Sequence, residues 1–166
     1  MKVIIKNKFL SITGKSTVKD EQGKDLFKVK GSFFNPKKTK KIKDLEGNTL
    51  YFVKNKIFTW LNKKVFIYDG EGELLGSIKR FNLSASNRYE LEGFADELNI
   101  DGEWFDMSNP IMKNGVQVGL IERKIISVTD TFTLNTDDTE NLAFYVALVI
   151  AIDNIRDERR NDRKNK

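Results

Sequence analysis

LAFYVALVIAI, at positions 142–152, is an uninterrupted run of eleven apolar residues. Acidic and hydroxyl residues precede it at Asp137–Glu140, and a charged segment rich in arginine begins at Arg156. Acidic and hydroxyl side chains suit the start of a helix, where backbone N–H groups are unpaired and the helix dipole is positive. Basic side chains suit its negative end. The pattern therefore predicts an α-helix over about 139–155.

This helix has two alternative environments, a lipid bilayer or a protein core. Eleven residues rise only about 16 Å, whereas about 20 apolar residues are needed to cross a bilayer. Asp153 would also lie in lipid. A helix that is apolar all round is otherwise buried on every side. In a chain rich in strands, a closed barrel can enclose such a helix and leaves no exposed strand edge. We therefore expect no transmembrane span.

A repeated unit supplies the strands of that barrel. It consists of an apolar residue, any residue, and then Asp-x-x-Gly. The copies are Val18–Gly23, Ile42–Gly47 and Ile67–Gly72, with a degenerate fourth copy at Ile111–Gly115. A leucine follows each of the first three glycines at the third position, at Leu26, Leu50 and Leu75. Asp and Gly suit tight turns, and the flanking residues alternate between apolar and polar. Each copy therefore predicts a β-hairpin.

Four hairpins and several shorter segments bring the expected number of strands to about twelve. We predict a mainly β fold, a closed or nearly closed antiparallel β-barrel of about twelve strands around a central hydrophobic C-terminal α-helix. The 166 residues suit one domain. We assign that domain, with its helix, to residues 1–155, and we treat 156–166 as a charged C-terminal tail.

The composition restricts the chemistry. The chain has no cysteine and no histidine, which excludes disulfides, cysteine-based metal sites and a histidine-dependent catalytic triad. The formal net charge is +5, and positions 156–166 contribute +3 of it. Because the rest of the chain carries little net charge, we expect no nucleic-acid partner. We also expect no cofactor. The N-terminus does not predict a signal peptide, so the expected location is the cytoplasm.

The hairpin repeat, Gly-Ser-Phe-Phe at Gly31–Phe34 and Ala-Leu-Val-Ile-Ala-Ile-Asp at Ala147–Asp153 together resemble bacterial LURP-one-related proteins. These proteins are relatives of the tubby C-terminal domain and of phospholipid scramblases. The resemblance covers about Lys2–Asp153 and implies a twelve-stranded barrel around a central hydrophobic helix. It implies little about activity, because fold does not determine function. Tubby domains bind phosphoinositide headgroups through basic side chains, but no binding residue is transferred to this sequence.

The densest group of basic residues before the tail is a candidate anion-binding site. It consists of Lys37, Lys38, Lys40, Lys41 and Lys43. Two interpretations remain open: a site for lipid headgroups or an acidic partner, and a solvated charge run that protects a strand edge. Alternation along a strand would place Lys40 and Lys43 on opposite faces.

Three further motifs are weaker. Ile57–Leu61 could form an aromatic tip at a membrane interface, although barrel packing is the alternative. Gly14–Ser16 mimics the end of a phosphate-binding loop but lacks the glycine that should stand five positions earlier. Four acidic residues invite a metal assignment, namely Asp130, Asp137, Asp138 and Glu140. Their spacing does not fit an EF-hand, and helix capping explains the last three. We assign no metal ligand and no catalytic residue.

The sequence therefore favours a non-enzymatic binding or scaffold domain that recognises an anionic phospholipid surface or an acidic protein. Peripheral association with a membrane is compatible with this interpretation. One alternative is a protein-interaction adaptor that uses the tail at 156–166. Another is a hydrolase or lipid-modifying enzyme that uses acidic residues, which would need convergent carboxylates with perturbed pKa values.

Overall fold

The computed structural model describes residues 1–6, 15–31, 39–55, 64–80, 89–101, 107–126 and 129–164. Within these ranges, the side chains of Lys6, Lys15, Arg80 and residues 125–126, 129–130 and 156–164 are not described.

The described residues form twelve strands and one helix. The strands are β1 (Lys2–Lys6), β2 (Lys15–Asp20), β3 (Asp25–Gly31), β4 (Lys40–Lys43), β5 (Thr49–Asn55), β6 (Lys64–Asp69), β7 (Leu74–Arg80), β8 (Tyr89–Glu92), β9 (Leu98–Ile100), β10 (Ser108–Lys113), β11 (Val116–Ile126) and β12 (Thr129–Thr136). The helix is α1 (Leu142–Lys164).

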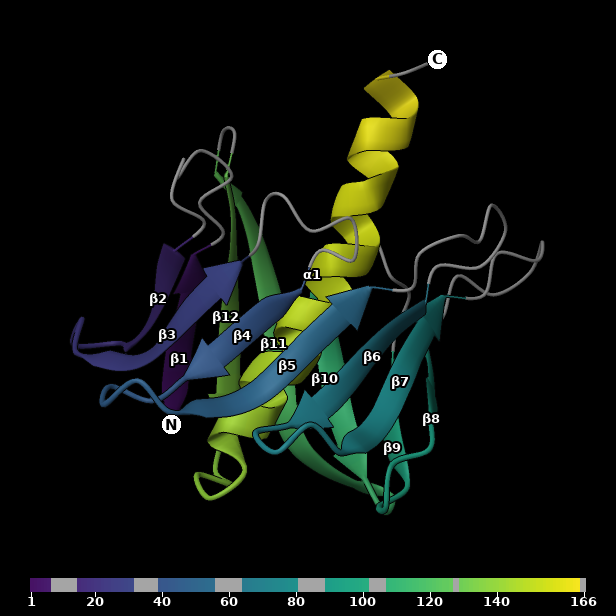
Figure 1. Cartoon of the computed structure of the whole chain (residues 1–166), viewed down its shortest axis with the longest axis horizontal. Helices are drawn as coiled ribbons and strands as arrows, with labels where there is room; N and C mark the ends of the chain where they lie inside the picture. The colour runs from purple at the N-terminus through teal and green to yellow at the C-terminus, as the bar shows by residue number, and fades with distance from the viewer. Residues whose placement is uncertain are drawn as a thin grey trace.

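The strands form one antiparallel sheet in which nearly every strand pairs with its neighbour in sequence. The order is β8-β7-β6-β5-β4-β3-β2-β1-β12-β11-β10-β9, so β1 joins the two meanders by pairing with β12. The edge strands β8 and β9 lie next to each other, which brings the sheet close to closure. Figure 1 shows α1 running through the centre of this nearly closed barrel. The predicted fold is confirmed.

The repeated aspartate closes each hairpin turn through its carboxylate. In the β6–β7 turn, Asp69 Oδ1 accepts hydrogen bonds from the backbone N–H groups of Glu71, Gly72 and Glu73 at 3.0, 2.8 and 2.8 Å. Gly72 has a φ of +98°, in the region where a side chain would be strained. The aspartates of the other two copies make equivalent bonds to their own turns. The prediction of turns at these positions is therefore confirmed.

The repeated leucine is the extra residue of a β-bulge. Opposite Val18 and Lys19 stand Phe27 and Asp25, so Leu26 is left between two paired residues. The same shift occurs in the next three hairpins, where the extra residues are Leu50, Leu75 and Val118. A bulge increases the local twist of a hairpin, and a sheet needs such twist to close into a barrel. The repeat thus encodes both the turns and the curvature of the wall.

The core lies between the inner face of the barrel and the helix. Most inward residues of the wall are aliphatic, and among them Ile42, Val53 and Ile67 are completely buried. On the helix, all side chains from Tyr145 to Ile152 are buried, with exposures of 4% or less. Burying each large aliphatic side chain contributes about 1.5–3 kcal/mol, so the wall and the helix stabilise the core together.

The ends of α1 differ from those predicted. The helix begins at Leu142, because Asp138 and Asn141 form a capping turn before it. Asp138 accepts hydrogen bonds from the backbone N–H of Asn141 at 3.2 Å and from the Tyr145 hydroxyl at 2.7 Å. At its other end the helix continues through the charged segment to Lys164. Figure 1 shows this extension projecting beyond the barrel.

The barrel has two distinct ends. The connections between β2 and β3, β4 and β5, β6 and β7, β8 and β9, β10 and β11, and β12 and α1 all lie at one end (Figure 1). We call it the turn end, and it consists of residues 20–24, 44–48, 69–73, 93–97, 114–115 and 137–141. The helix leaves the barrel at the opposite end, which we call the helix-exit end.

Candidate binding surface

The outer face of strands β3 to β6 carries lysines and aromatic residues at alternate positions. Along each strand, residues next to a buried one point outward. The outward residues beside Val29, Ile42, Val53, Val65 and Ile67 are Lys28, Lys30, Lys41, Lys43, Phe52, Lys54, Lys64, Phe66 and Tyr68. We call these nine residues the lysine–aromatic face. Six are lysines, three are aromatic, and none is acidic.

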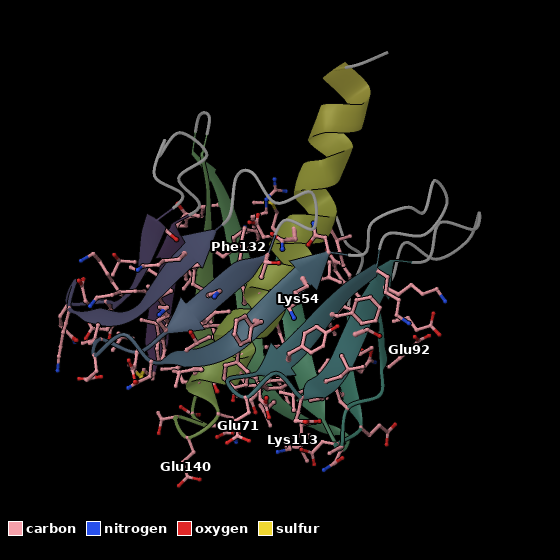
Figure 2. The ribbon with its side chains drawn as sticks, in the orientation of Figure 1. Lys54, Glu71, Glu92, Lys113, Phe132 and Glu140 are labelled. Carbon is pink, nitrogen blue, oxygen red and sulfur yellow. The ribbon has the colours of Figure 1, made fainter. Side chains whose placement is uncertain are left out.

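The register places several of these lysine ammonium groups against the aromatic rings. Lys54 Nζ lies over Tyr68 at 4.1 Å from the ring centroid and over Phe52 at 5.4 Å. Lys41 stands opposite Phe52 on the neighbouring strand β4, and its Nζ lies 5.1 Å from the centroid of the Phe52 ring. Lys64 Nζ lies 5.6 Å from the centroid of Phe66. Such contacts contribute about 0.5–1 kcal/mol each at exposed sites and hold the ammonium groups at defined positions. Figure 2 shows Lys54 on the outer side of β5.

Two pairs of lysines stand directly opposite each other on β3 and β4. They are Lys28 with Lys43 and Lys30 with Lys41. Like charges directly opposite on neighbouring strands destabilise a sheet. The first pair is relieved by backbone carbonyls of the β4–β5 turn, because Lys28 donates to Leu45 O and Lys43 to Gly47 O, each at 2.6 Å. The second pair lies nearer the helix-exit end, where an anionic ligand would relieve the same repulsion.

Beyond β6, the carboxylates of β8 pair with lysines of β6 and β7. Glu92 accepts from Lys64 at 2.5 Å and lies 3.8 Å from Lys79, which also pairs with Glu90 at 3.3 Å. The hydrogen bond from Lys64 lowers the pKa of Glu92, and Lys79 acts in the same direction. These carboxylates neutralise the β7–β8 side of the wall and leave the excess positive charge on β3 to β5.

The predicted lysine group is divided by the structure. Lys41 and Lys43 lie on the lysine–aromatic face, whereas Lys37 and Lys38 lie outside the described residues. Lys40 points inward from the start of β4 and forms an ion pair with Asp153 at 3.3 Å. The expectation that Lys40 and Lys43 occupy opposite faces agrees with this arrangement. Lys40 therefore does not join the other lysines on the outer surface.

Lys40 belongs to a polar group inside the barrel where α1 approaches the helix-exit end. Asp153 is 4% exposed, and its neighbour Asn154 donates to Asn55 Oδ1 of β5 at 2.9 Å. Asp153 and Asn154 of the helix are thus paired with side chains of β4 and β5, respectively. The arrangement fixes the depth and rotation of the helix.

The structure describes only part of the three remaining sequence motifs, which are the aromatic segment, Gly14–Ser16 and the acidic residues before the helix. Ile57–Leu61 and Gly14 lie outside the described residues, whereas Lys15 and Ser16 begin strand β2. Asp138 caps the helix, and the hydrogen bond from Tyr145 is the main cause of its lowered pKa. Burial and the same hydrogen bond raise the pKa of Tyr145. The described part of the chain contains no group of three or more acidic residues placed to hold a metal ion.

Sequence reasoning missed most of the lysine–aromatic face. It did not select Lys28, Lys30, Lys54, Lys64 or the three aromatic residues. The signal was present in the alternation around Val53, where Phe52 and Lys54 flank a buried residue. However, combining four strands into one surface requires their register, which residues far apart in the sequence establish. A search for runs of basic residues cannot detect such a surface.

Among the described residues, no helix has the length and apolar character needed to cross a membrane. This includes α1, whose second half carries the charged segment.

Comparison with known proteins agrees with the fold. A search of curated proteins found no match. Among solved structures, a protein from Arabidopsis thaliana matches with a TM-score of 0.61 and 17% sequence identity, over 93% of this chain and 91% of the plant protein. At this identity the match shows a shared fold. The family model described as LURP-one-related matches residues 1–153. The barrel, its central helix and this match together show that the chain belongs to the LURP-one-related family.

Proposed function

We propose that this chain is a non-enzymatic binding domain whose lysine–aromatic face docks onto an anionic lipid surface. The observation that carries the proposal is the composition of that face, with six lysines, three aromatic residues and no carboxylate at its nine outward positions. A surface of this kind attracts anions, and each basic group near an anionic bilayer contributes about 1 kcal/mol.

The aromatic residues favour a lipid interface over a purely ionic partner. Phe52, Phe66 and Tyr68 are partly exposed on the outer face of β5 and β6 instead of being packed into the core. Phe66 and Tyr68 lie beside each other, with ring centroids 6.5 Å apart. Aromatic rings are enriched at the boundary between lipid headgroups and acyl chains. The lysines would bind the phosphates, while the rings would enter the headgroup layer.

The described carboxylates support a binding role over an acid–base enzyme. A general acid at neutral pH needs a carboxyl group with a raised pKa. The carboxyl groups with shifted pKa values are Asp44, Glu92, Asp96 and Asp138, and all four are shifted downward by hydrogen bonds or ion pairs. Each of these carboxylates closes a turn, caps the helix or pairs with a lysine.

Vesicle flotation tests the proposal with matched variants. The test variant replaces Lys30, Lys41 and Lys54 by glutamine. The control replaces three exposed lysines elsewhere, Lys2, Lys24 and Lys124, and therefore has the same net charge. With vesicles of phosphatidylcholine and phosphatidylserine, the test variant should bind about tenfold to hundredfold more weakly, and the control within about threefold of the native chain. Native binding should also weaken as salt screens the charges.

Three results would contradict lipid docking. The first is no binding of the native chain to anionic vesicles at low salt. The second is an equal loss in the test and control variants, which would indicate a net-charge effect. The third is binding to single-stranded RNA without binding to vesicles, because lysines and aromatic rings on a sheet can also hold nucleic acid.

The second candidate function is a protein-interaction adaptor that uses the C-terminal segment. The observation that favours it is the continuation of α1 to Lys164, which presents the charged segment as a helix outside the barrel (Figure 1). Removing residues 156–166 should abolish binding to polyglutamate if this segment is the docking site. The same truncation should leave vesicle binding largely intact if the lysine–aromatic face is the site.

A further inference from the structure

Acidic residues are concentrated at the turn end of the barrel. Its six segments contain twelve of the 24 acidic residues of the chain but only one of the 29 basic residues, Lys24. Figure 2 shows Glu71 and Glu140 at this end, pointing away from the barrel. Aspartate side chains are ionised at neutral pH, and hydrogen bonds lower the pKa values of Asp44, Asp96 and Asp138 further; Asp96 also pairs with Lys113 at 3.0 Å.

Four of the six lysines of the lysine–aromatic face lie toward the opposite end, whereas Lys28 and Lys43 donate to the β4–β5 turn. Lys30 and Lys54 are the next-to-last residues of β3 and β5, and Lys41 and Lys64 lie at the start of β4 and β6. All four positions are therefore in the half of the wall near the helix-exit end. The helix also continues in that direction through 156–164, within the segment 156–166 whose formal charge is +3. Charge is thus segregated along the barrel axis.

The distance between the two regions allows them to act separately. Lys30, Lys54 and Lys64 stand five or six residues along their strands from the nearest turn, about 16–20 Å, which exceeds the Debye length of about 8–10 Å at physiological salt, and Lys41 stands three residues, about 10 Å, from its turn. The acidic turns therefore do not neutralise Lys30, Lys54 and Lys64. They would repel an anionic bilayer strongly only when they approached within a Debye length of it.

We infer that the domain meets an anionic bilayer with its barrel axis inclined, the helix-exit half of the lysine–aromatic face against the lipid and the turn end held away. This inference rests on the proposed function and adds an orientation to it. Lysine attraction at one end and carboxylate repulsion at the other produce a torque, whereas a uniformly basic face would allow the barrel to lie flat. The inclined orientation also brings the charged extension of α1 to the membrane side.

Single-cysteine labelling can measure this orientation, because the native chain has no cysteine. One variant is Thr39→Cys, just before β4 at the helix-exit end, and its partner is Gln22→Cys on the β2–β3 turn. Both residues are uncharged and neither belongs to the lysine–aromatic face. Each labelled protein is mixed with vesicles of about three parts brominated phosphatidylcholine to one part phosphatidylserine. Quenching of the fluorophore by bromine then reports its distance from the acyl chains.

The expected result is strong quenching of the label at position 39 and little at position 22. Equal or reversed quenching, with flotation still showing binding, would overturn the orientation and leave the proposed function standing. Absence of flotation would overturn the proposed function itself.

A charge variant tests the cause of the orientation. Replacing Glu46, Glu71 and Glu73 by glutamine removes three exposed carboxylates from the turn end without touching the turn aspartates. Quenching at position 22 should rise, and binding should tighten about twofold to tenfold, because the repulsion is reduced. Unchanged quenching and affinity would overturn the assigned role of the acidic turns.

Discussion

At the scale of single residues, an ion pair between Lys40 and Asp153 joins α1 to the barrel wall. The Asp153 carboxylate is almost completely buried, and removing the ammonium group that faces it takes away a favourable interaction of a buried charge. We expect Lys40→Met to destabilise the fold by about 3 kcal/mol, a value near the lower limit for such pairs because Lys40 is partly exposed. Urea unfolding measures the change.

A double-mutant cycle separates this charge effect from packing. Combining Lys40→Met with Asp153→Leu removes both charges, and the double variant should recover most of the stability lost in Lys40→Met. If the two losses are simply additive, the ion pair is not the source of the effect.

Gly76 shows how one residue adapts the repeat to its place in the barrel. Four positions after the turn glycine, the first two hairpins carry Phe27 and Tyr51, and the third carries Gly76. A Cβ atom at Gly76 would lie 2.7 Å from the ring of Phe94 and 2.8 Å from a backbone oxygen. Phe94 thus occupies the space of the missing side chain and packs edge-on against Phe144, with centroids 5.8 Å apart.

We therefore expect Gly76→Ala to destabilise the protein by about 2–3 kcal/mol, because neither the ring nor the backbone can move freely. Gly119→Ala is the matched control in a strand, since its nearest contact would be a flexible side-chain carbon at 3.3 Å. Thermal unfolding of both variants measures the difference. Similar losses would indicate that the close approach of Phe94 is unimportant.

Asp138 and Tyr145 give a prediction about pH. The pKa of Asp138 is lowered in the folded state, mainly by the hydrogen bond from Tyr145. A lowered carboxyl pKa stabilises the fold above the ordinary value of 3.8, and that stability is lost as pH falls through the folded pKa. Tyr145→Phe should therefore cost about 1 kcal/mol at pH 7 for the lost hydrogen bond.

The difference between native protein and Tyr145→Phe should shrink as the pH falls from the ordinary value of 3.8 through the lowered pKa of Asp138, because protonation of the carboxylate weakens the hydrogen bond that Tyr145 donates. Urea unfolding at pH 7 and at about pH 3 checks this. A difference that stays constant across that range would mean that the phenol ring stabilises the helix by packing alone.

At the scale of elements, the sequence predicted the hairpins better than the bulges. Asp-x-x-Gly specifies a turn by local chemistry, because the aspartate bonds to backbone within four residues of itself. The bulge at Leu26 could not be predicted, since it is defined by pairing across the strands. The start of α1 was also misplaced by three residues. Asp138 and Asn141 cap the helix through a turn that uses the side chains of both residues.

The candidate surface shows the same division between local and non-local information. The run around Lys41 was visible in sequence, yet the structure places Lys40 and Lys41 on opposite sides of the wall. Lys30 and Lys41 become neighbours only through the register of β3 and β4. A binding surface on the side of a barrel is therefore predictable only after the strand pairing is known.

At the scale of the whole molecule, the barrel is closed at two places. One is a hydrogen-bonded junction between β1 and β12, and the other is a seam between the edge strands β8 and β9. The junction joins β1 to β12 through five paired residues on each strand, although the two strands lie at opposite ends of the sequence. Hydrogen bonds in both directions between Met1 and Thr136 strengthen it at the turn end. The seam lies between β8 and β9, which are adjacent but are the two edges of the sheet.

Hydrogen exchange should therefore begin at the seam. An edge strand has one hydrogen-bonded neighbour, so its outer amide groups can open at lower free energy than those of an interior strand. We expect amides in 89–92 and 98–100 to exchange about tenfold or more faster than those of β1 and β12, which is a difference of about 1.4 kcal/mol in opening free energy. Exchange measured by mass spectrometry resolves these segments. If β1 exchanged first, the barrel would instead open at the junction of its two meanders, and the central helix would be held mainly by β5 and β6.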